Sequence, residues 1–148
     1  MAKSTPEIVH FTPHFQEREL LVLHKKIMET KELLETYYKG LARKQGWESV
    51  IADDFKFIGG DMTKQEPTVG KPAYEEVIKR FSLLFKDVRP KETFVTDHSA
   101  FVLANYDYAF PNDKSINASV AEYWQVKNGK LSALTIFFDT EGFRNYLK

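Results

Sequence analysis

The sequence of 148 residues contains no cysteine, no excess charge of either sign and no long apolar segment. Without cysteine, the chain cannot form disulfides, use a thiol as a nucleophile or bind metal through thiolates. Lysine and arginine number 21, as do aspartate and glutamate, and this balance gives no support to nucleic-acid or membrane-surface binding. No segment approaches transmembrane length and the first residues lack the apolar core of a secretion signal, so we expect a cytoplasmic protein.

Aromatic residues, in contrast, are abundant. They make up 14% of the chain, with twelve Phe and seven Tyr. Such a share favours a large core or a cavity lined by aromatic rings. A chain of this length buries about 70% of its unfolded surface, which suits one domain with a substantial core.

The segment 116–139 organises the predicted fold, because it carries Asn128-Gly129 between two apolar runs. Asn-Gly in this position is the strongest short-range signal for a β-hairpin with a type I′ turn, and the turn sets the register. On one predicted face, Val126 then pairs with Leu131, Trp124 with Ala133, Glu122 with Thr135 and Val120 with Phe137. The other face is also rich in apolar groups. We therefore expect one face to cover a core or a pocket and the other to meet a second layer or a second subunit.

Glu122 is the polar exception on the first of these faces, between Val120 and Trp124. Burial of a carboxylate is costly unless the group is paired, hydrogen-bonded or protonated. Glu122 therefore either lies near an open end of the sheet or is held by Thr135, or else it is a pocket acid with a raised pKa. Asp139 falls on the same face about 13 Å further along, so the two carboxyl groups do not form a close dyad unless a bulge intervenes.

Residues 12–43 show a helical pattern that Thr12-Pro13 is suited to start. Its apolar positions recur every seven residues, at Leu20, Ile27, Leu34 and Leu41. The segment forms one long helix or two shorter helices that break near Glu29-Thr30, and the pattern favours an amphipathic helix lying across a sheet over a coiled coil. His10 and His14 have the spacing of helical metal ligands, but no third ligand is suggested and we predict no metal site.

Further elements alternate with turn signals along the rest of the chain. The pattern predicts a short helix over 47–52, a strand over 55–58, a helix from Pro72 that Arg89-Pro90 stops, strands over 93–96 and 100–110, and a terminal helix capped by Thr140. Asn105 and Asp107 share the face of strand 100–110 opposite Tyr106. They are either polar groups of a pocket or solvent contacts near a sheet edge.

Three local signatures accompany this order of elements. They are Ala52-Asp53-Asp54-Phe55-Lys56-Phe57, Val69-Gly70-Lys71-Pro72-Ala73-Tyr74, and Glu122-Tyr123-Trp124-Gln125-Val126 with Asn128-Gly129-Lys130-Leu131. Over about residues 28–139 the chain resembles the nuclear-transport-factor-2-like superfamily, and within it the SnoaL-like branch. The resemblance implies an α+β fold, in which a curved antiparallel sheet wraps around helices to form a cone with an internal pocket, and homodimers that pack sheet against sheet. Residues 1–27 lie outside the resemblance, and we expect them to form a partly helical N-terminal extension to a single domain over 28–148.

The resemblance also suggests site residues, although this fold carries isomerases, cyclases, hydrolases and non-enzymatic modules. Glu122 matches the position where the ketosteroid isomerase branch places a protonated acid that stabilises an oxyanion. The position of that branch's general base is occupied here by Gly59, so Asp61 would have to reach in from the following loop. Tyr37 or Tyr38 would stand for the tyrosine that the branch carries on its helix.

Two functional hypotheses follow. The first is a protein that binds a small, mostly apolar molecule in the internal pocket without a cofactor, with proton transfer next to a carbonyl as its chemistry if it is an enzyme. Glu122 would be the acid or oxyanion partner, and Asp61, or Asp139 by similarity to SnoaL-type cyclases, would be the base. The expected ligand-binding residues are Phe55, Phe57, Tyr74, Asn105, Asp107, Trp124, Thr135 and Phe137.

The second hypothesis is a non-catalytic dimerisation or protein-binding module of the same fold. The interior would then be only a core, and Glu122 would be structural. A cavity of several hundred Å³ and a raised pKa of Glu122 would favour the first hypothesis. Both hypotheses predict a homodimer that forms through the sheet face.

Overall fold

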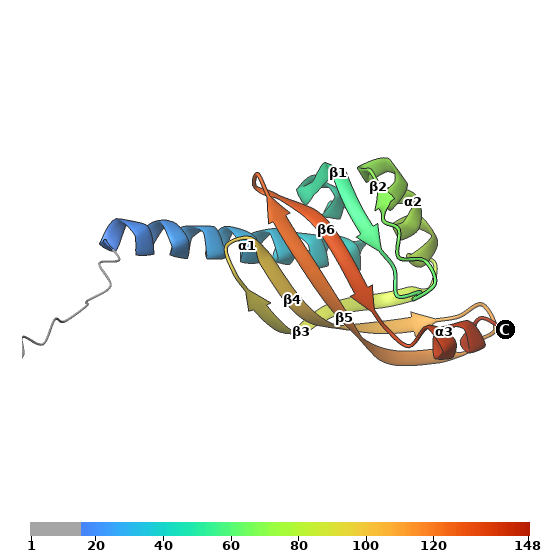
Figure 1. Cartoon of the computed structure of the whole chain (residues 1–148). Coiled ribbons are helices and arrows are strands. Elements are labelled where there is room, and N and C mark those ends of the chain that lie inside the picture. Colours follow the sequence, from blue (N-terminus) through green and yellow to red (C-terminus); the bar gives the residue numbers. More distant parts are fainter. Residues whose placement is uncertain (1–15) are drawn as a thin grey trace, which may run out of the picture.

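A computed structural model describes residues 16–148 and shows a curved six-stranded sheet wrapped around helices (Figure 1). The elements follow the chain as α1 (Glu17–Arg43), the 3₁₀ turn η1 (Trp47–Val50), β1 (Ile51–Ile58), β2 (Thr68–Val69), α2 (Lys71–Phe81), β3 (Phe85–Val95), β4 (Ser99–Ala109), β5 (Ser115–Lys127), β6 (Lys130–Phe137) and α3 (Thr140–Tyr146). The strand order is β2-β1-β6-β5-β4-β3. The α+β class and the curved sheet agree with the prediction, but the sheet is mixed, because β1 runs parallel to β6.

Helix α1 is continuous, so of the two alternatives the single long helix forms and the break near Glu29-Thr30 does not occur. Its last turn ends at Lys44, whose φ of 62° places it in the left-handed region that commonly terminates helices. The buried residues of α1 all lie in its second part, from Thr30 onward, where the helix packs against β3. The predicted helix start at Thr12-Pro13 and the histidines at positions 10 and 14 lie outside the described residues.

The hairpin between β5 and β6 forms around the predicted turn. Asn128 and Gly129 have φ angles of 51° and 71°, as both central residues of a type I′ turn require. Lys127 faces Lys130 and Val126 faces Leu131, as the register predicted.

Beyond these two pairs the predicted register is wrong by one residue. Between Val126–Leu131 and Gln125–Ala133 the strand β6 contains one extra residue, Ser132, which forms a β-bulge. Trp124 therefore pairs with Leu134 and Glu122 with Ile136, whereas Ala133 and Thr135 had been predicted in these places. Because side chains alternate along a strand, the bulge moves Leu134 and Ile136 to the inner face, and Thr135 and Phe137 to the outer face.

Two boundaries in the second half of the chain also differ from the prediction. Helix α2 ends at Phe81, and Arg89-Pro90, expected to stop it, lies inside β3. Proline is tolerated there because β3 is an edge strand and the register shifts just after Pro90. Asp139 caps α3 in place of Thr140, since its Oδ1 accepts a hydrogen bond from the backbone N–H of Gly142 at 2.9 Å.

The core lies inside the cone, between the second part of α1, α2 and the concave face of the sheet. Its largest fully buried side chains include Trp124, Tyr37, Tyr74 and Phe55. Among the described helices, none is both long enough and apolar enough to cross a bilayer.

Candidate functional site

Glu122 lies on the inner face of β5, and only 1% of its surface is exposed. Tyr38, from α1, donates a hydrogen bond of 2.5 Å to Oε2 of this carboxyl group. Tyr106, from β4, donates one of 2.6 Å to Oε1. The register had placed Glu122 on the interior face, and the structure confirms this position, but its partners are two phenols and not Thr135.

Burial raises the pKa of Glu122 above its ordinary value of 4.5, because removal from water disfavours the charged carboxylate. The hydrogen bonds from Tyr106 and Tyr38 act in the opposite direction and offset part of this effect. The pKa values of both tyrosines are raised as well, first by burial and then by the charge of Glu122. The three groups therefore all favour their neutral, protonated forms.

A second layer of aromatic side chains holds this cluster in place. The indole N–H of Trp124 donates to Oη of Tyr38 at 3.1 Å. Tyr37 and Tyr74 form a separate hydrogen bond of 2.6 Å through their hydroxyl groups, and the ring of Tyr37 packs edge-on against Trp124, with 4.6 Å between the centroids. Of the two tyrosines proposed to stand beside Glu122, the structure thus places Tyr38 there and Tyr37 one layer further back.

Glu122 and Tyr106 line an internal cavity of about 40 Å³. Its walls are otherwise aliphatic and aromatic, and they include the expected residues Phe57 and Tyr74. Phe55 and Trp124 were also expected to contact a ligand, but they lie behind this wall in the packed core. The volume is that of one or two water molecules and far below the several hundred Å³ of a typical ligand pocket.

Two further hollows adjoin the cavity at the open end of the cone. One of about 110 Å³ lies under α3, and one of about 190 Å³ lies between α3 and the end of β1. Phe138 borders all three spaces, and Phe143 of α3 borders the two outer ones. Phe143 packs against Phe138 and Phe81, with centroids 5.6 Å and 6.0 Å away. Aromatic side chains therefore divide one larger space into three.

The two aspartates proposed as bases lie outside the central cavity. Asp61 accepts hydrogen bonds from Thr63 and forms an ion pair with Arg144 at 2.9 Å. It borders the hollow between α3 and β1. Hydrogen bonds from Thr63 lower the pKa of Asp61, so this carboxyl group is ionised and already paired. Asp139 is engaged as the cap of α3 and borders the hollow beneath that helix. Among the described residues that line the central cavity, Glu122 is the only carboxylic acid.

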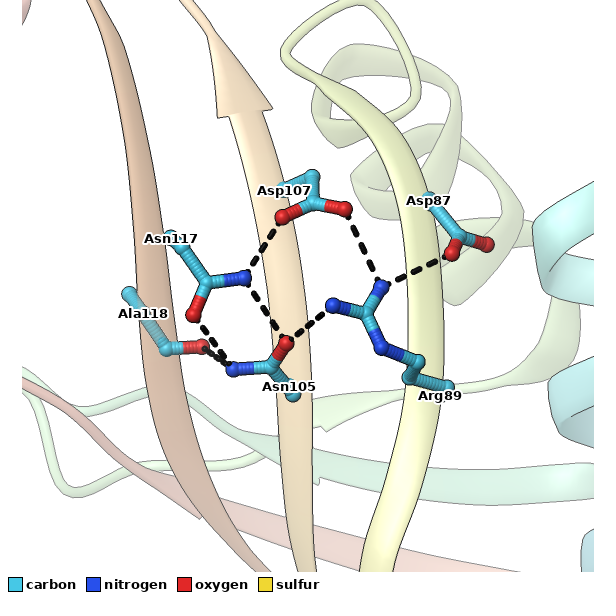
Figure 2. Close-up of polar contacts among 6 residues, drawn as sticks. All are labelled: Asp87, Arg89, Asn105, Asp107, Asn117 and Ala118. Carbon is cyan, nitrogen blue, oxygen red and sulfur yellow. Dashed lines mark hydrogen bonds and ion pairs between the residues drawn. The ribbon is translucent and has the colours of Figure 1, made fainter.

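Asn105 and Asp107 lie on the outer face of the sheet and not in the cavity (Figure 2). Arg89 connects them, because its guanidinium donates to Asn105 Oδ1 at 2.6 Å and to Asp107 Oδ2 at 3.0 Å, and it also pairs with Asp87 at 2.8 Å. Asn117 completes the network with hydrogen bonds to Asn105 and Asp107. These groups hydrogen-bond across β3, β4 and β5, so the reading as pocket polar groups is wrong for both residues.

Thr135 and Phe137 are on this outer face too, as a result of the bulge in β6, and Phe137 is 57% exposed. Neither residue lines the central cavity, contrary to the expectation.

No family model and no curated protein matches the sequence. Comparison of the structure with solved structures, in contrast, gives many matches. One is an NTF2-like protein of unknown function from Burkholderia pseudomallei, with a TM-score of 0.71, 16% identity, and coverage of 81% of this chain and 98% of that one. A protein described as a SnoaL-like polyketide cyclase, from Jannaschia sp. CCS1, matches with a TM-score of 0.71 and 13% identity over 81% of this chain and 92% of that one. Rv0760c from Mycobacterium tuberculosis, in complex with estradiol-17β-hemisuccinate, matches with a TM-score of 0.65 and 14% identity over 76% of this chain and 95% of that one.

This chain has the nuclear-transport-factor-2-like fold. The likeness extends to the SnoaL-like proteins of that fold, as the sequence signatures had suggested. At these identities it concerns the fold, and the chemistry of the site rests on the chain's own residues.

Two residues of this NTF2-like cone were not foreseen as parts of the site. Tyr106 pairs with Ala118, four residues before Glu122 on β5, and its side chain reaches back along the concave face. Alternation placed Tyr106 on the face opposite Asn105 and Asp107, but it did not tell which of the two faces is the inner one, and the reach across a curved sheet is a three-dimensional property. Phe138 follows the end of β6, and only the packing of α3 over the cone brings it to the cavity.

The described part of the cone contains no group of three histidine, aspartate or glutamate side chains that could hold a metal ion. The polar end of the cavity consists of one carboxyl group and phenols, and these groups suit a hydrogen-bonding ligand better than a cation.

Proposed function

We propose that this protein binds a small, mostly apolar molecule inside the cone, with an oxygen atom of the ligand directed at Glu122 and Tyr106. The observation that carries the proposal is a buried carboxyl group with a raised pKa, located on the wall of an aromatic cavity and held by two phenols. Perturbed carboxyl groups in such positions are typical of functional sites. The solved structure of Rv0760c with an estradiol derivative supports the same class of ligand for this fold.

The number of hydrogen-bond donors depends on the protonation of Glu122. When the carboxylate is ionised, Tyr38 and Tyr106 both donate to it and neither proton is free for a ligand. When Glu122 is protonated, its own O–H donates a hydrogen bond to one of the phenols. That phenol keeps its proton but no longer donates it to Glu122, so it can donate to a ligand instead. Because Tyr106 faces the cavity, its hydroxyl group then serves a carbonyl or phenolate oxygen of the ligand.

Binding of a ligand requires more space than the central cavity of about 40 Å³ provides. Phe138 separates it from the hollows of about 110 Å³ and 190 Å³, so a rotation of this side chain and a shift of α3 would join the three. No residue of α3 is fully buried, so a shift of this helix would break mainly the ring contacts of Phe143 and Tyr146. We therefore place the ligand between Glu122 and the inner side of α3.

Binding is favoured over proton transfer, because an isomerase or cyclase needs a second group to accept the proton. Asp61 and Asp139 border only the outer hollows, and both are already engaged in other contacts. Their role as a base stays a prediction, and turnover assays on any bound carbonyl compound would decide it.

A thermal-shift screen with planar phenols, quinones and steroid-like ketones tests the proposal. A ligand at a hundred times its dissociation constant stabilises the protein by about 2.7 kcal/mol, or about 5–11 °C for a chain of this size. Glu122→Gln and Tyr106→Phe should reduce the shift, whereas Tyr123→Phe, on the outer face, should leave it unchanged. The proposal fails if no compound stabilises the wild type, or if Tyr106→Phe responds as the wild type does.

We further propose that two copies pack through the outer face of the sheet. Phe94, Phe101 and Tyr123 lie in one row across β3, β4 and β5, and they are 65%, 42% and 40% exposed. Exposed aromatic patches of this kind are typical of interfaces between proteins. Light scattering should therefore give a mass of at least a dimer, and Phe101→Lys should reduce this mass. A monomeric wild type at micromolar concentration would contradict the proposal.

A further inference from the structure

Helix α1 extends beyond the body of the protein (Figure 1). Its first 13 residues, from Glu17 to Glu29, precede Thr30, the first buried residue of the helix. At 1.5 Å per residue this segment is about 20 Å long. We call residues 17–29 the overhang. Leu21 and Val22 in it are 68% and 53% exposed.

The overhang continues the apolar stripe that the rest of α1 buries. Leu20, Leu23 and Ile27 occupy the same positions of the seven-residue repeat as Leu34 and Tyr37, which are buried against the sheet. Leu20 is 50% exposed and Leu23 is 40% exposed. One half of the stripe thus has a partner within the chain, whereas in the other half Ile27 is half-buried and Leu20 and Leu23 remain exposed among the described residues.

We propose that the overhang packs antiparallel against the overhang of a second copy of this chain. A two-fold axis near residues 21–22 places Leu20 of each copy against Leu23 of the other, at the centre of the contact. Helix formation has already been nucleated by the buried half of α1. The short contact therefore does not bear the nucleation penalty that makes isolated helices of this length marginal.

The charges beside the stripe select the antiparallel orientation. Glu19 and Lys26 lie on one flank, and Glu17, His24 and Lys31 on the other. In an antiparallel pair, each flank faces the same flank of the second copy. Glu19 then meets Lys26 of the second copy, and Glu17 meets His24 of the second copy. Each pair occurs twice because of the two-fold symmetry. A parallel pair would instead place Lys26 against Lys31 of the second copy, and Glu19 would meet His24 in place of Lys26. The charge pattern therefore favours the antiparallel arrangement.

This contact differs from the proposed sheet dimer, because it uses another surface. The aromatic row lies on the outer face of the sheet, whereas the stripe of the overhang continues the side of α1 that packs inside the cone. Two separate two-fold contacts would assemble the chain beyond a dimer.

Charge reversal followed by sedimentation velocity tests the proposal. Lys26→Glu turns both symmetric pairs with Glu19 from attraction into repulsion and should weaken the association about tenfold. Lys25→Glu makes the same change in net charge on the side of the helix away from the stripe, and it should have little effect. The double variant Glu19→Lys/Lys26→Glu restores the pairs and should recover the association. A parallel pair would give the opposite result, since Glu at position 26 would then face Lys31.

A matched pair of apolar variants provides a second readout. Leu23→Ser removes the centre of the stripe and should reduce the mass of the assembly, whereas Leu21→Ser, off the stripe and more exposed, should not. Both variants replace leucine with serine at an exposed position and therefore lower the helix propensity by the same amount. Neither should unfold the protein. Equal masses for wild type, Leu23→Ser and Lys26→Glu at all concentrations would overturn the proposal.

Because the chain has no cysteine, a spin label can be attached to a single introduced cysteine, and distances between two labelled copies report the geometry directly. Labels at positions 18, 25 and 32 all lie on the side opposite the stripe. The antiparallel pair predicts equal axial separations of about 10 Å at positions 18 and 25, and about 30 Å at position 32. These separations should persist in the Phe101→Lys background, which separates the overhang contact from the sheet dimer. Three equal separations would overturn the antiparallel arrangement.

Discussion

The pH dependence of stability depends on Glu122, and the variant Glu122→Gln isolates its contribution. Burial raises the pKa of the folded-state carboxyl group above its ordinary value of 4.5. Between the unfolded and folded pKa values, the native protein binds more protons than the unfolded chain does, so its stability falls as the pH rises. The contribution is fully present below the unfolded pKa and is lost as the pH rises through the folded pKa.

The size of the effect follows from the shift. Each unit by which the pKa is raised corresponds to about 1.4 kcal/mol of free energy of unfolding, or about 3–6 °C in Tm for a chain of this size. Glutamine has nearly the same volume as glutamate and stays neutral at every pH. Its carbonyl accepts from one phenol and its amide N–H donates to the other, so both Tyr38 and Tyr106 keep a partner.

Urea denaturation of wild type and variant from pH 4 to pH 9 measures the effect. The difference between the two curves cancels the contributions of all other titrating groups. We expect the free energy of unfolding of the variant to increase relative to that of the wild type as the pH rises from about 4.5. The difference should reach a plateau above the folded pKa of Glu122. Glu35→Gln, at an exposed position of α1, is the control for the loss of one charge. A flat difference, or one in which the wild type gains with pH, would refute the reasoning.

Three further predictions concern the register, the cap of α3 and the outer polar network. Leu134→Ala should destabilise the protein by about 2–5 kcal/mol and Phe137→Ala by less than about 1 kcal/mol in urea denaturation, because the bulge buries the first side chain and exposes the second. Asp139→Ala should cost about 1 kcal/mol through loss of the hydrogen bond to Gly142, and it should increase proteolysis near the C-terminus. Hydrogen bonds from Asn117 and Arg89 lower the pKa of Asp107, so wild type should lose stability as the pH falls below 4, and Asp107→Asn should lose less. Equal effects at positions 134 and 137, an unchanged α3 without its cap, or identical acid profiles would contradict these three predictions in turn.

The sequence predicted the features that depend on local chemistry. Asn128-Gly129 fixed a type I′ turn, because both residues adopt positive φ angles readily, and the alternation from that turn placed Glu122 inside. The bulge at Ser132 could not be foreseen, since no proline or glycine marks it and it depends on how β6 meets both β5 and β1. All errors on β6, including the outward positions of Thr135 and Phe137, follow from this single residue.

The candidate site was predictable only in part, for a related reason. The carboxyl group could be found from its polar character in an apolar face, and the resemblance to a fold narrowed its tyrosine partner on the helix to Tyr37 or Tyr38. Tyr106 and Phe138 reach the cavity through the curvature of the sheet and the packing of α3, which no spacing along one strand records. The polar network of Arg89 was missed because Arg89-Pro90 suggested the end of a helix and not an edge strand.

The extra residue in β6 also decides where the strand tolerates a change in length. Deletion of Ser132 would let the two strands pair without interruption, and Leu134 and Ile136 would stay opposite Trp124 and Glu122. Deletion of Leu134 with the bulge kept would instead place Thr135 opposite Trp124 and Phe137 opposite Glu122, so that inner and outer faces exchange along the rest of the strand. A loss of three nucleotides would thus be mild at codon 132 and severe two codons later. Among descendants of this sequence, deletions in β6 should therefore be confined to position 132.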